Sequence, residues 1–185
     1  MLSWIFSRLY FFLPVYIANI SPPLANRFGI LKFLKKPVDG KKKINDIRIL
    51  GSHKTWRGVF VEIVNGIIII YLQRWLYQFP FFETHSLLNY QRENILLLGF
   101  LLSAGAVAGD LASAFFKRRL KLKPGARFMP FDQINYVIGA FVFLSLFSEI
   151  NLKIFSWLVL LFLTFFLHVA TNLTGYYLGL HKAKW

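Results

Sequence analysis

Apolar residues gather in five long stretches, with short polar and basic segments between them. The stretches are Leu2–Ile20, Trp56–Tyr77, Ile95–Phe116, Phe131–Ser148 and Ile154–Leu180. The hydrocarbon core of a bilayer is about 30 Å thick and needs about 20 helical residues to cross it. Each stretch reaches or approaches that length. The pattern therefore predicts an all-α integral membrane protein, a bundle of about five transmembrane helices.

The first stretch has two possible interpretations, a cleaved signal peptide or a retained span. No basic segment precedes its apolar run, and no clear small-residue cleavage site follows it. A secretory signal peptide needs both features. We therefore expect residues 2–20 to be a retained first span.

Composition supports a membrane protein and excludes some kinds of site. Hydrophobic residues make up 56% of the 185-residue chain, yet its formal net charge is +14. Apolar content and positive charge coexist because the cations are confined to the segments between the stretches. The chain contains no cysteine, which excludes disulfides and thiolate metal sites.

The basic residues are distributed unevenly between the two sides of the predicted bundle. Ten Lys and Arg lie between Arg27 and Arg57, six between Lys117 and Arg127, and two after Leu180, against four on the other side. Basic loops remain in the cytoplasm. Loops 21–55 and 117–130 and the C-terminus are therefore predicted to be cytoplasmic, with the N-terminus outside. We expect residues 1–185 to form a single membrane domain in the cell membrane.

Polar residues cluster at the predicted cytoplasmic end of the third stretch. Asp110, Ser113 and Lys117 share one helical face, and Asp132 and Gln133 open the fourth stretch at the same membrane level. Two carboxylates facing a basic loop suit Mg²⁺ and phosphate, because Mg²⁺ is usually held by one or two carboxylates plus substrate phosphates. A structural interpretation is equally open: Asp110 would pair with Lys117 or Arg118, and Asp132 would cap a helix.

A second basic motif precedes the second stretch. Lys54, Thr55 and Arg57 lie at a predicted helix N-terminus, which favours anions. The segment is not a Walker A loop, because His53 stands where the second glycine is required. On charge alone, the simpler interpretation is a basic membrane anchor with a threonine cap.

Three further polar positions within the apolar stretches invite a functional interpretation. Asn19, before Ser21-Pro22-Pro23, is expected to mark the end of the first span. Glu62 is expected to be paired within the bundle and is given no role. His168 and Asn172 share a face of the fifth stretch, where a structural hydrogen bond is favoured over ligand binding.

Several motifs occur in an order that resembles the CDP-archaeol synthase family, small membrane cytidylyltransferases related to CDP-diacylglycerol synthases. They are Ala18-Asn19-x-x-Pro22; Pro37-x-Asp39-Gly40; Asp46; Ile49-Leu50-Gly51-x-x-Lys54-Thr55-Trp56-Arg57-Gly58; Gly109-Asp110 through Lys117-Arg118-Arg119; Gly125; Asp132-Gln133; His168-x-x-x-Asn172; and Leu178-Gly179-Leu180 with Trp185. The resemblance covers most of the chain.

The resemblance implies a reaction in which CTP and a lipid phosphate give a CDP-lipid and pyrophosphate, with Mg²⁺ as cofactor. It implies that Asp110 and Asp132 hold the metal and that these two residues and Lys117 are catalytic. The substrate-binding residues it implies, for CTP, phosphate or the lipid head, are Asn19, Lys54, Thr55, Arg57, Ser113, Arg118, Arg119 and Gln133. The partners would be CTP, an anionic lipid phosphate and membrane lipids, with no nucleic acid and with a homodimer as the assembly.

Some residues depart from the family pattern and leave the lipid substrate open. The His-Gly-Gly segment of CDP-diacylglycerol synthases is absent, and Ile47 follows Asp46 where many archaeal members have glycine. The lipid could be archaetidic-acid-like or phosphatidic acid. A CDP-alcohol phosphotransferase is disfavoured because Lys41 follows Asp39-Gly40. A polybasic lipid-binding protein without enzymatic activity explains the charge but not the matched aspartates.

Overall fold

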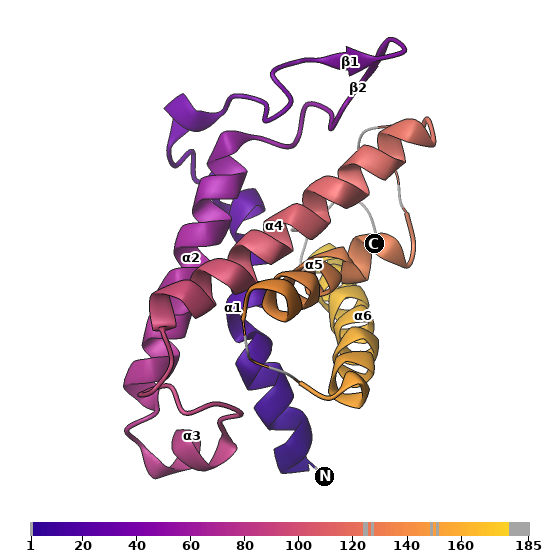
Figure 1. Cartoon of the computed structure of the whole chain (residues 1–185). Coiled ribbons are helices and arrows are strands. Elements are labelled where there is room, and N and C mark those ends of the chain that lie inside the picture. The colour runs from indigo at the N-terminus through magenta and orange to yellow at the C-terminus, as the bar shows by residue number, and fades with distance from the viewer. Residues whose placement is uncertain (1, 124–125, 127, 149, 151, 178–185) are drawn as a thin grey trace.

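A computed structural model describes residues 2–123, 126, 128–148, 150 and 152–177. The elements, in chain order, are α1 (Leu2–Arg27), the 3-10 helix η1 (Lys32–Leu34), β1 (Lys43–Ile44), β2 (Ile47–Arg48), α2 (Trp56–Leu76), α3 (Pro80–His85), α4 (Ile95–Arg119), α5 (Phe131–Phe147) and α6 (Ile154–Tyr177). The protein is a helical bundle in which α4 crosses between α2 and α5, and α6 packs beside α5 (Figure 1).

Apart from single residues at two ends, the described parts of the five predicted stretches are helical, but the first boundary was wrong. Helix α1 continues through Pro22 and Pro23 to Arg27, so Asn19 does not mark its end. Each proline removes one helical hydrogen bond. The helix continues because it packs along α2, where Gly58 lies opposite Pro22, and tertiary packing overrides the local preference.

The other boundaries differ from the prediction by a few residues. Helix α4 runs to Arg119, three residues beyond Phe116, so its basic end is helical. Helix α2 ends at Leu76 and α5 at Phe147, one residue early in each case. The predicted end of the fifth stretch, residues 178–180, and the basic tail lie outside the described residues.

Three of the described helices are long and apolar enough to cross a membrane: Trp56–Leu76, Ile95–Arg119 and Ile154–Thr174. Helix α5 is apolar but has only 17 residues, which span about 25 Å at 1.5 Å per residue. Helix α1 has 26 residues and contains three prolines. The structure supports a multi-pass membrane protein, whereas the number of five spans and the cytoplasmic side stay predictions.

Close backbone contact between α4 and α5 fixes the centre of the bundle. A methyl group added at Gly109 would overlap the carbonyl of Asn135, and one at Gly105 would lie 2.6 Å from the carbonyl of Gly139. Small residues allow membrane helices to approach closely. Because the approach falls at Gly109, the next residue, Asp110, is placed near the beginning of α5.

The two ends of the bundle are different. The segment from 28 to 55, with the β1–β2 hairpin, lies at the end where α4 terminates, and α3 lies at the opposite end (Figure 1). Strand β1 pairs with β2 in antiparallel fashion, with Lys43 opposite Arg48. We call the end that carries residues 28–55 and the C-terminal end of α4 the basic end.

Candidate active site

A polar cavity of about 250 Å³ lies at the basic end, between the segment before α2, the last turns of α4 and the start of α5. Its lining residues are Leu50, Gly51, His53, Lys54, Asp110, Ser113, Ala114, Lys117, Arg118 and Asp132. Lys54, Lys117 and Arg118 contribute three positive charges, and the two aspartates contribute two negative charges. This excess of cations favours an anionic ligand.

The lining of the cavity follows from helical periodicity. Five of its residues, Asp110, Ser113, Ala114, Lys117 and Arg118, come from α4, and their spacings of three, one, three and one place them on one face. Asp132 lies in the first turn of α5, and Lys54 precedes the first residue of α2 by two positions. Three segments far apart in the sequence therefore supply one site.

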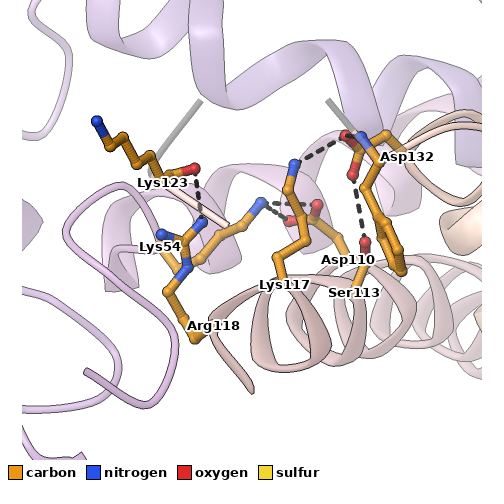
Figure 2. A network of polar contacts seen from close by, with 8 residues as sticks. Lys54, Asp110, Ser113, Lys117, Arg118, Lys123 and Asp132 are labelled. Atoms are coloured by element: carbon orange, nitrogen blue, oxygen red, sulfur yellow. Dashed lines mark hydrogen bonds and ion pairs between the residues drawn. The ribbon is translucent and has the colours of Figure 1, made fainter. Parts of the chain in front are cut away.

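Asp110 is paired with Lys54. The Lys54 ammonium donates to both carboxylate oxygens of Asp110, at 2.7 and 2.5 Å (Figure 2). The side chains retain 28% and 23% of their exposure, so the pair is open to a ligand entering the cavity. Lys117 and Arg118 were the partners of Asp110 expected from the sequence, but the observed partner, Lys54, comes from a different segment.

Asp132 is paired with Lys117. The Lys117 ammonium donates to Oδ2 of Asp132 at 2.8 Å, and the Ser113 hydroxyl donates to Oδ1 at 3.3 Å (Figure 2). The backbone N–H of Phe128 also donates to Oδ2, at 3.0 Å. Asp132 is therefore not the N-cap of α5, a position held by Pro130. Its carboxylate instead joins α4 to α5 beside the cavity.

Arg118 closes the cavity against the loop. Its side chain is buried, and one guanidinium nitrogen donates to the carbonyl of Lys123 at 3.1 Å (Figure 2). A Cβ added at Gly51 would lie 3.8 Å from the side chain, so Arg118 packs over Gly51. Its Nε has no hydrogen-bond partner within the described part of the chain, which leaves one donor for a ligand.

Asp39 organises the loop that carries Gly51 and Lys54. Its fully buried carboxylate accepts hydrogen bonds from Arg48 at 2.7 Å and from the backbone N–H groups of Lys41, Leu50 and Gly51 at 3.0 to 3.2 Å. Burial alone would raise the pKa of Asp39, but these hydrogen bonds outweigh it and hold the pKa below its usual value. From the sequence, Asp39 was recognised only as part of the Pro37-x-Asp39-Gly40 motif, and this role was not predicted.

Arg119 and Arg57 have structural contacts outside the polar cavity. Arg119 donates to the carbonyls of Ile44, Ile47 and Arg48 at 3.3, 3.3 and 3.0 Å, which ties the hairpin to α4. Arg57 is buried, and it donates to Oδ1 of Asn26 at 2.6 Å and to the carbonyl of Ile30 at 3.3 Å.

The remaining predicted residues are divided between neighbouring positions. Thr55 caps α2, where its hydroxyl accepts from the N–H of Gly58 at 3.3 Å. Gln133 is buried next to Asp132, and its side-chain oxygen has no partner among the described residues. The described lining of the polar cavity includes neither Asn19 nor Gln133. His168 lies deeper in the bundle, with its ring 6.4 Å from that of Tyr136.

Two further hollows border the polar cavity. A small cavity of about 60 Å³ is lined by Pro22, His53, Lys54, Thr55, Gly58, Val59, Glu62, Val107, Asp110 and Leu111. An apolar groove of about 320 Å³ between α4 and α5 is lined by Ala108, Gly109, Ala112, Ser113, Phe116, Phe128, Phe131, Asn135, Ile138, Gly139, Val142 and Phe143. The groove shares Ser113 with the polar cavity, and the small cavity shares His53, Lys54 and Asp110 with the polar cavity.

The donor set of the polar cavity suits a hard cation. Asp110, Asp132 and Ser113 offer oxygen atoms only, which Mg²⁺ prefers. Within the described ranges, no group of three or more His, Cys, Asp or Glu side chains is arranged to hold a metal ion. A metal there would therefore depend on the two aspartates together with ligand oxygens and water.

The fold and the cavity define a multi-pass helical membrane protein with an anion-attracting site at one end. The sequence matches the family model described as CarS-like, CDP-archaeol synthase, over residues 1–185. The chain belongs to this family.

Curated relatives and a solved structure agree with the family assignment. The CDP-archaeol synthase of Methanococcoides burtonii is 36% identical over 94% of this chain and 99% of its own length. That of Methanococcus maripaludis is 34% identical over 100% and 99%. A structure described as an intramembrane enzyme for archaeal membrane lipid biosynthesis shares the fold, with a TM-score of 0.70 and 23% identity over 89% of this chain and 92% of that chain.

Proposed function

We propose that this protein transfers the cytidylyl group of CTP to an archaetidic-acid-like lipid phosphate, giving a CDP-archaeol-type lipid and pyrophosphate. The observation that carries the proposal is the convergence of two carboxylates and three cationic side chains on one cavity, next to an apolar groove. Family membership over the whole chain supports this reaction. The product would supply phospholipid biosynthesis.

The reaction needs charge neutralisation and positioning more than proton transfer. An oxygen of the lipid phosphate attacks the α-phosphorus of CTP, and the bond between that phosphorus and the α,β-bridging oxygen breaks to release pyrophosphate. The attacking group is already an anion, so a dedicated general base is not required. Lys54, Lys117 and Arg118 are placed to hold phosphate oxygens as charge moves onto the leaving group.

Asp110 and Asp132 are the residues that would hold Mg²⁺, because both line the cavity and offer only oxygen ligands. When bound, the metal would supply charge neutralisation at the attacking and leaving oxygens. Each aspartate is now balanced by one lysine. Ligation of a cation by these carboxylates would free the ammonium groups of Lys54 and Lys117 to pair with phosphate, so both lysines exchange one anionic partner for another.

The apolar groove is placed to take the lipid chains. Ser113 lies on both the groove and the polar cavity, so a lipid whose phosphate enters the cavity can lay its chain between α4 and α5. The groove lining is almost wholly apolar and aromatic. Ser113 and the side chain of Asn135 are the polar exceptions, and the side-chain oxygen of Asn135 has no hydrogen-bond partner within the described part of the molecule.

The predicted substrate-binding residues differ in the contacts that they make, and we propose different roles for them. Lys54, Ser113 and Arg118 keep their proposed role in binding, and Thr55 acts as the helix cap next to Lys54. We propose that Arg57 and Arg119 support the site through Asn26 and the hairpin, because their guanidinium groups are engaged with protein acceptors. Asn19 and Gln133 are assigned no contact with phosphate. Cytoplasmic orientation of the basic end and a homodimeric state also stay predictions.

The test is a transfer assay with two lipids in parallel. Purified protein in detergent is incubated with Mg²⁺, CTP labelled at the α-phosphate, and either unsaturated archaetidic acid (digeranylgeranylglyceryl phosphate) or phosphatidic acid. We expect label in the lipid extract with the first lipid, and no lipid label when CTP is labelled at the γ-phosphate.

The other outcomes separate the alternatives. Label with phosphatidic acid alone would retain the reaction and assign it to CDP-diacylglycerol formation. No label with either lipid, from folded protein that binds nucleotide, would overturn the enzymatic proposal in favour of a lipid-binding protein.

A further inference from the structure

Glu62 is a buried acid for which the reaction described above has no use. It lies in the second turn of α2 and is only 6% exposed. In the part of the chain that the structure describes, its carboxyl group has no hydrogen bond and no ion pair with another side chain. Burying an acid without a partner is costly, and buried charges are normally paired or bound to metals. The pairing expected from the sequence is therefore not found.

Glu62 faces the small cavity that borders the active site. Asp110 lies on the other side of this cavity, and Lys54 lines it as well. The lining thus holds two carboxylates and one ammonium, and the Lys54 ammonium is bonded to both oxygens of Asp110 and not to Glu62. Besides Glu62, Asp110 and Lys54, His53 is the one titratable residue in the described lining that could neutralise the charge of Glu62. With Glu62 ionised, the two carboxylates of the small cavity exceed the single Lys54 ammonium by one negative charge.

The size of this cavity suits an ion and not a nucleotide. Its volume is about 60 Å³, which is close to two water molecules at about 30 Å³ each. The polar cavity next to it is about four times larger. A phosphate chain fits the larger space, whereas a single cation with one or two waters fits the smaller one.

We propose that Glu62 and Asp110 bind a divalent cation in the small cavity, at a position separate from the one between Asp110 and Asp132. Glu62 supplies a carboxylate that no other group occupies, and Asp110 lines both cavities and supplies the second carboxylate. In the substrate-free protein Lys54 competes for this position, because its ammonium already holds Asp110. This inference rests on the proposed function in one respect only: the phosphate with which Lys54 would pair after leaving Asp110 is that of the substrate.

Competition with Lys54 gives the site a specific behaviour. A cation and the ammonium repel each other next to Asp110, so removing the charge of Lys54 should strengthen cation binding. A phosphate ligand that draws Lys54 into the polar cavity should strengthen it too. Because coupling between two ligands is reciprocal, the cation should strengthen phosphate binding by the same factor.

The test measures binding of Mn²⁺, a paramagnetic substitute for Mg²⁺, from the free-ion electron paramagnetic resonance signal. The Asp132→Asn variant in detergent removes the carboxylate of the other position, so cation binding then depends on the small cavity. Adding Glu62→Gln to this background should weaken Mn²⁺ binding by about 10- to 100-fold. Adding Lys54→Met instead should strengthen it, and so should adding pyrophosphate to the Asp132→Asn protein.

The matched control is Glu83→Gln in the same background, which makes the same chemical change at an exposed acid of α3. It should leave Mn²⁺ binding unchanged. If Glu62→Gln does not fold, as judged by thermal unfolding, Glu62→Asp is the second variant. It keeps the carboxylate but shortens the side chain by one methylene. This variant should still weaken Mn²⁺ binding by several-fold.

Mn²⁺ binding that is equal with and without Glu62, in the folded protein, would overturn the inference. Because the assay contains no CTP and no lipid, its result is independent of turnover. A Glu62-dependent Mn²⁺ site in a protein without cytidylyl transfer would support this inference and would contradict only the proposed reaction. Transfer activity with no Glu62-dependent Mn²⁺ site would do the opposite.

Discussion

Two regions at the basic end use aspartates in different ways. Asp39 lies in the loop before α2, within residues 28–55, where its fully buried carboxylate accepts four hydrogen bonds. Asp110 and Asp132 lie a short distance away on the polar cavity, where each is paired with one lysine and keeps 23% and 28% of its exposure. All three form ion pairs with basic side chains, yet only two line a cavity.

The difference is in what each carboxylate can still bind. Asp39 has its oxygen atoms directed at fixed backbone N–H groups, so it cannot accept a metal or release its partner without unfolding the loop. The lysines on Asp110 and Asp132 are flexible and can be replaced by a cation. A saturated carboxylate stabilises the fold, whereas an open one is available for chemistry.

Outside Asp110, the largest effect is expected at Asp132. The variant Asp132→Asn should lower the rate of cytidylyl transfer on the order of 10³-fold, because a charged ligand and the partner of Lys117 are lost together. Its free energy of unfolding should change by less than about 1 kcal/mol, as expected for a partly exposed ion pair. Initial rates and unfolding in mixed micelles measure the two quantities. The control is Asp46→Asn, an exposed aspartate in the hairpin turn, which should leave both unchanged.

The opposite pattern is expected at Asp39. The variant Asp39→Asn should lower the free energy of unfolding by about 2 to 3 kcal/mol, because a fully buried, charged acceptor of four hydrogen bonds becomes neutral. At a temperature where the variant is folded, it should retain most of its transfer activity. Unfolding by denaturing detergent, followed by tryptophan fluorescence, gives the stability. A stability equal to that of the wild type would remove the distinction between the two regions.

The stabilisation by Asp39 should depend on pH in a defined direction. Its folded-state pKa lies below the ordinary value of 3.8, so its contribution is complete above that value and is lost as the pH falls through the folded pKa. The difference in unfolding free energy between wild type and Asp39→Asn should be constant above about pH 5 and should shrink below pH 3.8. A difference that stays constant down to pH 2.5 would contradict the assignment of a lowered pKa.

The smallest effect is expected at Thr55, which lies between the two regions. Thr55→Ala removes the cap that accepts from Gly58 and should cost about 1 kcal/mol of stability. Thr84→Ala, at an exposed threonine that caps no long helix, is the control and should change stability by less than about 0.5 kcal/mol. Equal stabilities of the two variants would show that the cap has no net role.

The long apolar stretches were readable from the sequence because length and hydropathy alone determine them. The five long helices were predicted. Six residues that line the polar cavity were also predicted from the sequence as site residues: Lys54, Asp110, Ser113, Lys117, Arg118 and Asp132. The extent of α1 was not readable. Pro22 and Pro23 are local stop signals, and the packing of α1 on α2 that overrides them is a tertiary property.

The pairing of charges was also beyond the sequence. Asp110 and Lys117 share a face of α4, but seven residues correspond to about 10.5 Å of helix, too far for a direct ion pair. Each finds a partner on another segment, Lys54 for Asp110 and Asp132 for Lys117. The contacts of Arg57 with Asn26 and of Arg119 with backbone carbonyls likewise depend on the loop conformation, which no periodic pattern in the sequence predicts.

The most direct test of the account compares Asp110→Asn with Asp39→Asn in one transfer assay, with α-labelled CTP and archaetidic acid, at a temperature where both are folded. The open carboxylate should be indispensable and the saturated one dispensable. We therefore predict no detectable lipid label for Asp110→Asn and nearly wild-type labelling for Asp39→Asn. Retained transfer by folded Asp110→Asn would contradict the central claim that the open carboxylates of the polar cavity carry the reaction.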